Sequence, residues 1–559
     1  MMAALLGGPV RHRLTFDRVL WLGGLLLAVL TLRAGWHDLV EVVGFDGLTH
    51  DEAISLQAIT GHQLDTHRLV VGEVVPMASV QRWGQLDPDR SAADTLAGLA
   101  ATDFHPPAYF LLARVWLRLG GALGLALDDP RRALDVDVWL ARGSGGRLWL
   151  AMLALMAEGL RRRDRVGWAC VGAAVLFPLN VEVVRESSNI RPYALLILVT
   201  VLAWLLLLRL LQRDGRAHRG STAALAGLLA LGLLTHYLFA CVAAALLLAL
   251  LPIRGRRAVA VGAVAVVPSL PWLVTLGDRA GTPPNHLRRT ADGLEASIER
   301  LDALLRGYFS LDEVFVDGPL EALPPWALPA SIGIVVVVLL LRRDRVGRAL
   351  ALALAFPLAL PLLVDLIAHK RLLSTDRVAV AFVPLAFWAM AWLAAGLGRR
   401  LGPVLVVLAG LWTIPALAPL EPEAANVNVF GGERLHREQR RHPDARILVA
   451  TTTDSRGQLM QRARYLPADA DLVLVEGKGL GGQVVAAAED HDLVHVLLMR
   501  RPRGHPRIGT RRIKGLDRAM GRAGWEQSGR KRWQRNGWVQ YRRRAEKEGP
   551  KSGRPAKRR

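Results

Sequence analysis

Two adjacent carboxylates stand in a polar stretch that follows an apolar run. Asp51 and Glu52 belong to the segment Leu48-Thr49-His50-Asp51-Glu52-Ala53 of a chain that is 52% apolar. An ionised carboxylate in hydrocarbon is costly, so acids placed here must face water or a substrate cavity. A carboxylate within hydrogen-bond reach of a hydroxyl or amine can serve as a general base. The competing interpretation is a helix start, because Thr49 and Glu52 have the spacing of a capping box.

Four further groups of polar residues lie between apolar runs. His105 precedes two prolines, which fix the backbone at the entry of a helix. The connection Arg185–Tyr193 carries two arginines and Glu186, and the guanidinium fork suits bidentate contacts with phosphate. The other two groups are Thr235-His236-Tyr237 and the stretch His369–Arg377, which contains Lys370. Each group has an ordinary alternative, a helix entry or an interfacial anchor, but together they predict one polar site at one face of a membrane.

The sequence contains no phosphate-binding glycine loop and no dinucleotide fingerprint, which argues against a nucleotide-dependent enzyme. Its two cysteines, Cys170 and Cys241, lie within apolar runs and predict neither a disulfide framework nor a metal cluster. A divalent metal ion is left open, with His50, Asp51, Glu52 and His105 as its candidate ligands. No helical His/Glu pair supports such a site, so no cofactor is predicted with certainty.

The positive charge of the chain is spread over short clusters. Lys and Arg number 71 against 49 Asp and Glu, which gives a formal net charge of +22. Many of these cations lie between apolar runs, and the rest crowd after Arg434. The basic C-terminal part has no nucleic-acid recognition motif, so nucleic acid is not a predicted partner.

The apolar runs predict a polytopic helical membrane protein. Spans of about 20 residues give about eleven transmembrane helices, with interfacial helices beside them. The spans are Val19–Trp36, Leu140–Leu160, Val166–Val184, Tyr193–Leu211, Ser221–Thr235, Tyr237–Leu251, Ala258–Leu276, Trp326–Leu341, Ala349–Ile367, Val378–Leu397 and Pro403–Pro419.

The positive-inside rule sets the predicted orientation. The run Pro107–Leu127 carries Arg114 and Arg118 on one helical face and is assigned to the interface, with both arginines toward headgroups. The N-terminus is then cytoplasmic and the C-terminal region extracytoplasmic. With that choice, nearly all the short arginine clusters fall in the cytoplasm, at Arg161–Arg165, Arg213–Arg219, Arg254–Arg257, Arg342–Arg348 and Arg399-Arg400.

The predicted domains follow from these spans. Residues 1–419 form the transmembrane domain, with outer loops at 37–139 and 277–325, and the helical spacing of Ala291–Gly307 predicts a mobile cover for the outer face. Residues 420–543 form a small soluble α/β domain, and residues 544–559 form a disordered basic tail. The predicted strands of the α/β domain are Arg446–Ala450, Asp471–Val475 and Val494–Leu498, and a helix is predicted at Gly457–Tyr465.

Several of these motifs resemble those of the GT-C membrane glycosyltransferases. The Asp51-Glu52 segment is similar to the acidic motif of that superfamily, and His105-Pro106-Pro107-Ala108-Tyr109 to its His-Pro-Pro-led helix. Arg191-Pro192-Tyr193-Ala194-Leu195 and Thr235-His236-Tyr237 match further recurring pieces, in the correct order. The relatives are the protein O-mannosyltransferases and the aminoarabinose transferase of lipid A. The resemblance covers roughly residues 15–400.

The resemblance implies transfer of a sugar from a polyprenyl-phosphate donor to a lipid, glycan or protein acceptor, at the outer face of the cell (inner) membrane. By position, Asp51 is the base and Glu52 its neighbour. The residues that would bind the donor or its phosphate are His105, Arg191, Tyr193, His236, Lys370 and Arg377. The family often has an acid two residues before the arginine, where this chain has Asn189, and Glu186 is the candidate second acid.

Two alternatives stay open. A transporter or flippase for a lipid-linked sugar could use the same arginines, but it would need charged groups deep within spans. Glu158 and Asp365 lie near the ends of their spans, so the sequence shows no relay of this kind. A catalytically inactive GT-C-like scaffold is the second alternative, because Asn189 departs from the family pattern.

Overall fold

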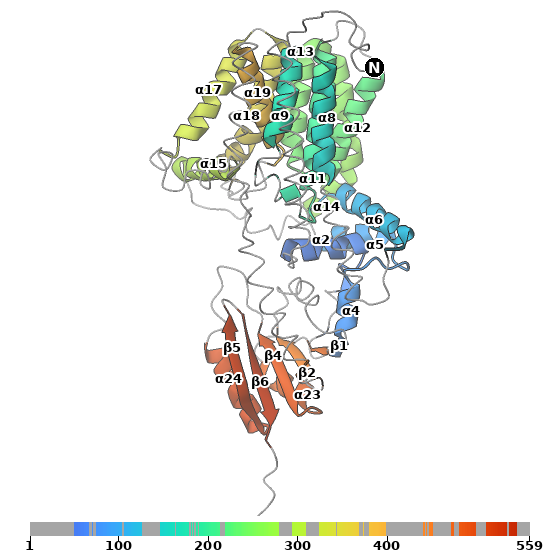
Figure 1. Cartoon of the computed structure of the whole chain (residues 1–559), viewed down its shortest axis with the longest axis vertical. Helices are drawn as coiled ribbons and strands as arrows, with labels where there is room; N and C mark the ends of the chain where they lie inside the picture. Colours follow the sequence, from blue (N-terminus) through green and yellow to red (C-terminus); the bar gives the residue numbers. More distant parts are fainter. Residues whose placement is uncertain are drawn as a thin grey trace, which may run out of the picture. The chain divides into compact units, whose positions relative to one another are not determined.

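The computed structural model describes a mostly helical chain that divides into two compact units (Figure 1). Unit 1 comprises Met1–Phe45, Thr95–Gly120 and Trp139–Glu421, and unit 2 comprises Asp46–Asp94, Gly121–Val138 and Pro422–Arg559. The described residues are 50–65, 70, 74–102, 105–125, 146–162, 164–177, 180, 183, 186–187, 189–212, 219–278, 293–308, 324–342, 344–367, 373, 380–397, 440–441, 443, 446–450, 471–473, 480–498, 510–533 and 536–544.

Unit 1 is built from apolar helices that pack on one another at the positions predicted for spans. They are α8 (Gly146–Arg161), α9 (Arg165–Leu176), α11 (Tyr193–Gln212), α12 (Arg219–Thr235), α13 (Phe239–Val266), α17 (Ala327–Leu341), α18 (Arg345–Ile367) and α19 (Val383–Gly396). Figure 1 shows α8, α9 and α11 running side by side, and α9 also packs on α19. Helix α11 is buried along most of its length, at Trp204, Leu207 and Leu208 for example, so it forms part of the core of this unit.

Helix α13 reverses direction at Arg254, whose backbone has φ −145° and ψ 47°. A Cβ added at Gly262 would lie 3.2 Å from Leu247 Cδ1. In one straight helix these two residues would be about 22 Å apart, at about 1.5 Å per residue. The two arms of α13 therefore lie side by side, as two separate apolar runs predict.

Three helices among the described residues are long and apolar enough to cross a membrane, at Tyr193–Gln212, Phe239–Thr275 and Arg345–Ile367. The second stretch includes the reversal at Arg254, so it forms two arms rather than one long rod. Shorter apolar helices lie at Arg165–Leu176, Arg219–Thr235, Ala327–Leu341 and Val383–Gly396. The predicted spans Val19–Trp36 and Pro403–Pro419 lie outside the described residues, and the total of about eleven stays a prediction.

The run assigned to the interface forms α6 (Ala108–Gly120), continued by a π-helical turn, η1 (Gly121–Leu125). Its exposed side is apolar, with Val115, Trp116 and Leu119 each 44–54% exposed, as expected for a helix that meets lipid. The prediction that both arginines face headgroups is wrong for one of them. Arg118 is exposed, but Arg114 is 1% exposed, because it lies on the side of the helix that also buries Tyr109 and Leu117.

The predicted cover helix is α15 (Leu294–Tyr308), which packs on α17 and α18. It buries Leu301, Leu304 and Leu305. Arg300 Nε lies 3.7 Å from Oδ2 of Asp365, a fully buried residue near the end of α18. An apolar face and the Arg300–Asp365 ion pair thus help to hold this helix on the bundle. That α15 is a mobile cover of the outer face stays a prediction.

Unit 2 contains a four-stranded sheet in the order β2-β4-β6-β5. Strands β2 (Arg446–Ala450) and β4 (Leu493–Leu498) are parallel and match two predicted strands, whereas β5 (Trp525–Trp533) and β6 (Asn536–Arg543) form an antiparallel hairpin that the sequence analysis missed. Helices α23 (Leu480–Ala488) and α24 (Thr510–Arg522), labelled in Figure 1, contribute Val484, Leu516 and Met520 to a common core. From the strands this core receives Val494, Val496, Trp525 and Tyr541.

The third predicted strand has a different partner. β3 (Asp471–Val473) pairs antiparallel with β1 (Val74–Pro76), which precedes α4 (Met77–Arg82), so the polar first loop and the C-terminal region share a two-stranded sheet within unit 2. The predicted helix Gly457–Tyr465 and the basic tail lie outside the described residues. The domain boundaries at 419 and 543 stay predictions.

Candidate active site

Three motifs that are far apart in the sequence meet at one end of unit 1. The ring centroids of His105 and His236 are 5.5 Å apart, and that of Tyr193 lies 5.7 Å from His236. Tyr237 is closer still, at 4.5 Å from the His236 ring. His236 is 2% exposed and Tyr193 is 1% exposed. The structure therefore brings together three of the predicted donor-binding residues, His105, Tyr193 and His236.

The tight turn between α12 and α13 fixes the orientation of His236. Its backbone N–H donates to Gly232 O at 3.0 Å, and its carbonyl accepts from Phe239 N at 3.0 Å. The backbone N–H of Leu238 donates to His236 Nδ1 at 3.2 Å. Because Nδ1 accepts, a neutral His236 carries its proton on Nε2. A hydrogen bond that the neutral ring donates therefore comes from Nε2.

His105 is held by the entry of α6. Leu111 N donates to Pro107 O at 3.1 Å, which closes the first helical turn after the two prolines. Phe110 lies edge-on to the His105 ring at 6.4 Å, and Tyr109 is fully buried beside it. The guanidinium of Arg147, in the first turn of α8, lies 5.5 Å from the centroid of the Tyr109 ring.

The predicted arginine and the candidate second acid lie just before α11. Arg191 is 6% exposed, and its backbone N–H donates to Asn189 O at 2.7 Å. Asn189 Nδ2 in turn lies 3.4 Å from Oε2 of Glu186, which is 5% exposed. Glu186 is therefore in hydrogen-bond reach of the residue that stands where the family often has an acid. A carboxylate and a guanidinium on one buried connection can bind a sugar hydroxyl and a phosphate oxygen.

The two predicted catalytic acids belong to unit 2. Asp51 and Glu52 lie in the first turn of α2 (His50–Thr60), where negative charge is favourable to a helix. Asp51 is half-buried and Glu52 is 1% exposed. The structure thus supports the helix-start interpretation of this motif, while its catalytic role stays a prediction. Lys370 and Arg377 lie outside the described residues.

A further polar cluster follows α2 and was not predicted. Gly61, with φ 86°, ends the helix, and His62 N donates back to Gln57 O at 2.9 Å, as in a Schellman motif. His62 Nδ1 then lies 2.7 Å from Asp65 Oδ2, which also accepts from Arg90 Nη2 at 2.8 Å. The helix-ending glycine is the one local signal in the sequence that could have indicated where His62 stands.

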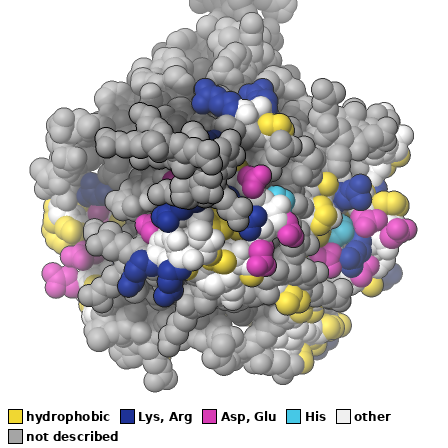
Figure 2. All heavy atoms as spheres, turned by 90° about the horizontal axis from the view of Figure 1, so that it is seen from below, with side chains coloured by type: hydrophobic (Ala, Val, Ile, Leu, Met, Phe, Trp, Pro, Cys, Tyr) yellow, Lys and Arg dark blue, Asp and Glu magenta, His cyan; other side chains and the backbone are white. Residues whose placement is uncertain are grey.

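The face that Figure 2 draws is not uniformly basic where its residues are described. Lys and Arg side chains alternate there with Asp and Glu. Within the described ranges, no group of three or more His, Cys, Asp or Glu side chains could hold a metal ion. The described side chains of the candidate site are hydrogen-bond donors and acceptors, which can bind a polar or anionic organic group.

The apolar helices of unit 1 and their arrangement are those of a helical membrane protein. Its fold resembles that of a solved structure, ArnT from Cupriavidus metallidurans in the apo state, with a TM-score of 0.50 at 12% sequence identity, covering 92% of this chain and 97% of that chain. ArnT is the lipid A aminoarabinose transferase. ArnT from the same organism bound to undecaprenyl phosphate gives a TM-score of 0.43 at 15% identity, with the same coverage. No protein-family model matches the sequence, and no curated protein matches it.

Proposed function

We propose that this protein is a membrane glycosyltransferase that moves a sugar from a polyprenyl-phosphate donor to an acceptor at the extracytoplasmic face. The single observation that carries the proposal is the cluster of His105, Tyr193 and His236 at one end of a helical bundle with the GT-C fold. The sequence resemblance nominated these three residues separately. Their proximity supports one common site.

The chemistry of the candidate residues fits a phosphate leaving group. His236 can donate from Nε2, and the Arg191 guanidinium can stabilise negative charge as the glycosidic bond breaks. Asp51 takes the proton of the acceptor hydroxyl or amine, so that the acceptor displaces the polyprenyl phosphate directly with inversion. Glu52 orients this carboxylate, and Glu186 serves as a second acid that binds a sugar hydroxyl. A lipid-linked phosphate needs no nucleotide.

Transfer of label from a radiolabelled polyprenyl-phosphate sugar by the purified protein tests this function. The expected result is a labelled product that forms in detergent solution with the wild type and is strongly reduced with Asp51→Asn. A transporter would instead move the intact donor across a proteoliposome membrane without forming a product. An inactive scaffold would bind the donor and do neither.

A further inference from the structure

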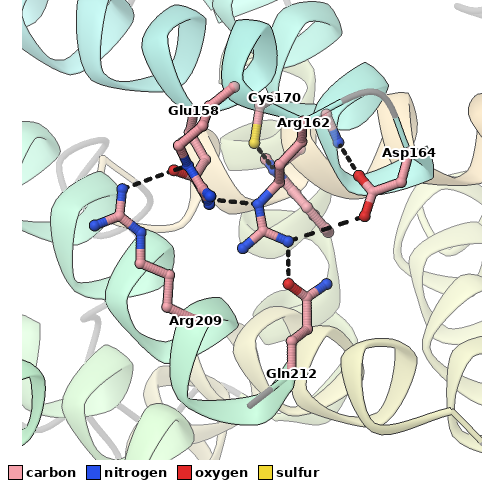
Figure 3. A network of polar contacts seen from close by, with 9 residues as sticks. Glu158, Arg162, Asp164, Cys170, Arg209 and Gln212 are labelled. Carbon is pink, nitrogen blue, oxygen red and sulfur yellow. Dashed lines mark hydrogen bonds and ion pairs between the residues drawn. The ribbon is translucent and has the colours of Figure 1, made fainter. Parts of the chain in front are cut away.

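A second polar cluster lies at the opposite end of unit 1 from the histidines. It centres on Glu158, near the C-terminal end of α8, whose side chain is 1% exposed. Oε1 of Glu158 accepts from Arg161 Nη2 at 2.5 Å and from Arg162 Nε at 2.6 Å. Oε2 accepts from Arg161 Nε at 3.0 Å and from Arg209 Nη2 at 2.7 Å. One buried carboxylate therefore holds three guanidinium groups, of which Figure 3 labels those of Arg162 and Arg209.

The neighbouring elements make this cluster rigid. Arg162 donates from Nη1 to Gln212 Oε1 at the end of α11, and the same atom lies 3.9 Å from Asp164 Oδ2. Asp164 in turn caps α9 by accepting from Gly167 N at 2.9 Å. Figure 3 shows Arg162 lying between Asp164 and Gln212. The ends of α8 and α11 and the start of α9 thus fix the arginines.

Two of the three arginines have accessible side chains. Arg161 is 52% exposed and Arg209 is 42% exposed, whereas Arg162 is 12% exposed. Arg161 binds Glu158 through Nε and Nη2, and Arg209 binds it through Nη2. Because both bind the same carboxylate, their guanidinium groups lie near one another.

The charge of the cluster is unbalanced by one unit. Three arginines contribute +3, and Glu158 with Asp164 contributes −2, which leaves +1. One further monovalent anion would neutralise it. Guanidinium groups recognise phosphate oxygens by bidentate, charge-assisted bonds. A phosphodiester carries one negative charge and matches this requirement.

An apolar stripe on α8 leads to the same arginines. Leu150, Leu153 and Leu160 are 53–55% exposed, at helical spacing on one face of the helix, and Arg161 follows directly. A stripe of exposed leucines that ends in a cation is what a lipid with an anionic headgroup would cover. A free phosphate ion has no apolar part, so it would leave these leucines uncovered.

We propose that Arg161 and Arg209 form a binding site for the phosphodiester of an anionic phospholipid, whose acyl chain lies along Leu150, Leu153 and Leu160. The site is at the opposite end of the bundle from the candidate active site, and it does not depend on the proposed transferase function. Glu158 acts there by keeping the two like-charged guanidinium groups together.

Lipid binding by the full-length purified protein in detergent tests the proposal. Phosphatidylglycerol and phosphatidylcholine are titrated in turn, and bound lipid is counted by native mass spectrometry alongside thermal unfolding. The wild type is expected to retain and be stabilised by phosphatidylglycerol in preference to phosphatidylcholine. Equal retention of the two lipids by the wild type overturns the proposal, whatever the variants do.

A matched pair of variants separates a specific site from general attraction. Arg161→Gln with Arg209→Gln removes two charges from the cluster and is expected to weaken phosphatidylglycerol binding roughly tenfold or more for each arginine. Arg256→Gln with Arg257→Gln removes two charges from exposed residues at the turn of α13 and should leave binding unchanged. Equal losses in both pairs overturn the site. Stabilisation by glycerophosphoglycerol, the soluble phosphodiester headgroup, equal to that by the lipid overturns the lipid assignment.

Discussion

The rings of His105 and His236 lie 5.5 Å apart in an edge-to-face arrangement, and the centroid of the Tyr193 ring lies 5.7 Å from that of His236. This relationship joins the entry of α6, the turn between α12 and α13 and the start of α11 into one site. His236 is buried, and its Nδ1 accepts a hydrogen bond from Leu238 N–H, so a hydrogen bond that its neutral ring donates comes from Nε2. Substitutions at this residue can therefore separate its structural role from its binding role.

The first prediction concerns His236. His236→Asn places an oxygen near the position of Nδ1, so the Leu238 N–H keeps an acceptor, but the Nε2 donor is lost. We expect near-normal thermal unfolding and a loss in transfer of about 1–3 kcal/mol of barrier, roughly tenfold or more. His236→Ala removes the acceptor as well and should also lower stability. Full transfer activity in the Asn variant would contradict a substrate contact.

The second prediction concerns the acid that precedes Arg191. If Glu186 replaces the missing family acid, Glu186→Gln should reduce transfer, and adding Asn189→Asp should restore part of it. Asn189→Asp alone should destabilise the protein, because Asn189 Nδ2 and Glu186 Oε2 lie 3.4 Å apart and two carboxylates would repel there. Transfer rates and thermal unfolding of the three variants provide the measurement. A double variant no more active than Glu186→Gln would exclude an exchangeable acid.

The third prediction concerns the acids of α2. Loss of a positioned general base typically lowers the rate by about 10²–10⁴-fold, roughly 3–5 kcal/mol of barrier, and we expect this for Asp51→Asn. Glu52 is 1% exposed, so Glu52→Gln should affect folding more and chemistry less. Donor binding, unfolding and turnover are measured separately. A folded, donor-binding Asp51→Asn protein with normal turnover would refute the assignment.

The fourth prediction concerns the packing that supports His236. A Cβ at Gly232 would overlap the ring of Phe239, whereas a Cβ at Gly227, on the same helix, would meet nothing within 4 Å. Gly232→Ala should therefore destabilise the protein by about 1–3 kcal/mol. Gly227→Ala is the matched control and should be neutral or stabilising by up to about 1 kcal/mol. The measurement is the thermal unfolding temperature of both variants. Equal changes in this temperature would show that the Phe239 ring moves aside without cost and would contradict the prediction.

The fifth prediction concerns the docking of α15. Arg300 pairs with Asp365 on α18, whereas Arg306 pairs with Asp302 on α15 itself, at 2.6 Å. Arg300→Gln should therefore speed hydrogen exchange along α15, since it removes a contact between elements. Arg306→Gln removes an equal charge within the helix and should have a smaller effect. Comparable exchange in both variants would assign the docking to Leu301, Leu304 and Leu305 alone.

The sequence by itself determined where the apolar helices lie. Runs such as Tyr193–Leu211 and Ala349–Ile367 became α11 and α18, because a long apolar segment in lipid must satisfy its backbone hydrogen bonds internally. The sequence also predicts β2 and β4, because each is a short run of mostly apolar residues. The β5–β6 hairpin was missed because its charged residues, including Arg530 and Arg542, hide the alternation of a strand.

Tertiary structure decided which side chains meet. Spacing placed Arg114 and Arg118 on one face of a helix, yet packing buried Arg114 and left Arg118 exposed. The sequence nominated His105, Tyr193 and His236 one by one, but their proximity depends on how α6, α11 and α12 pack. It likewise gave no sign that Arg209 would reach Glu158. Periodicity reports the environment of a single segment, whereas these contacts join distant segments, so only the packing of the helices determines them.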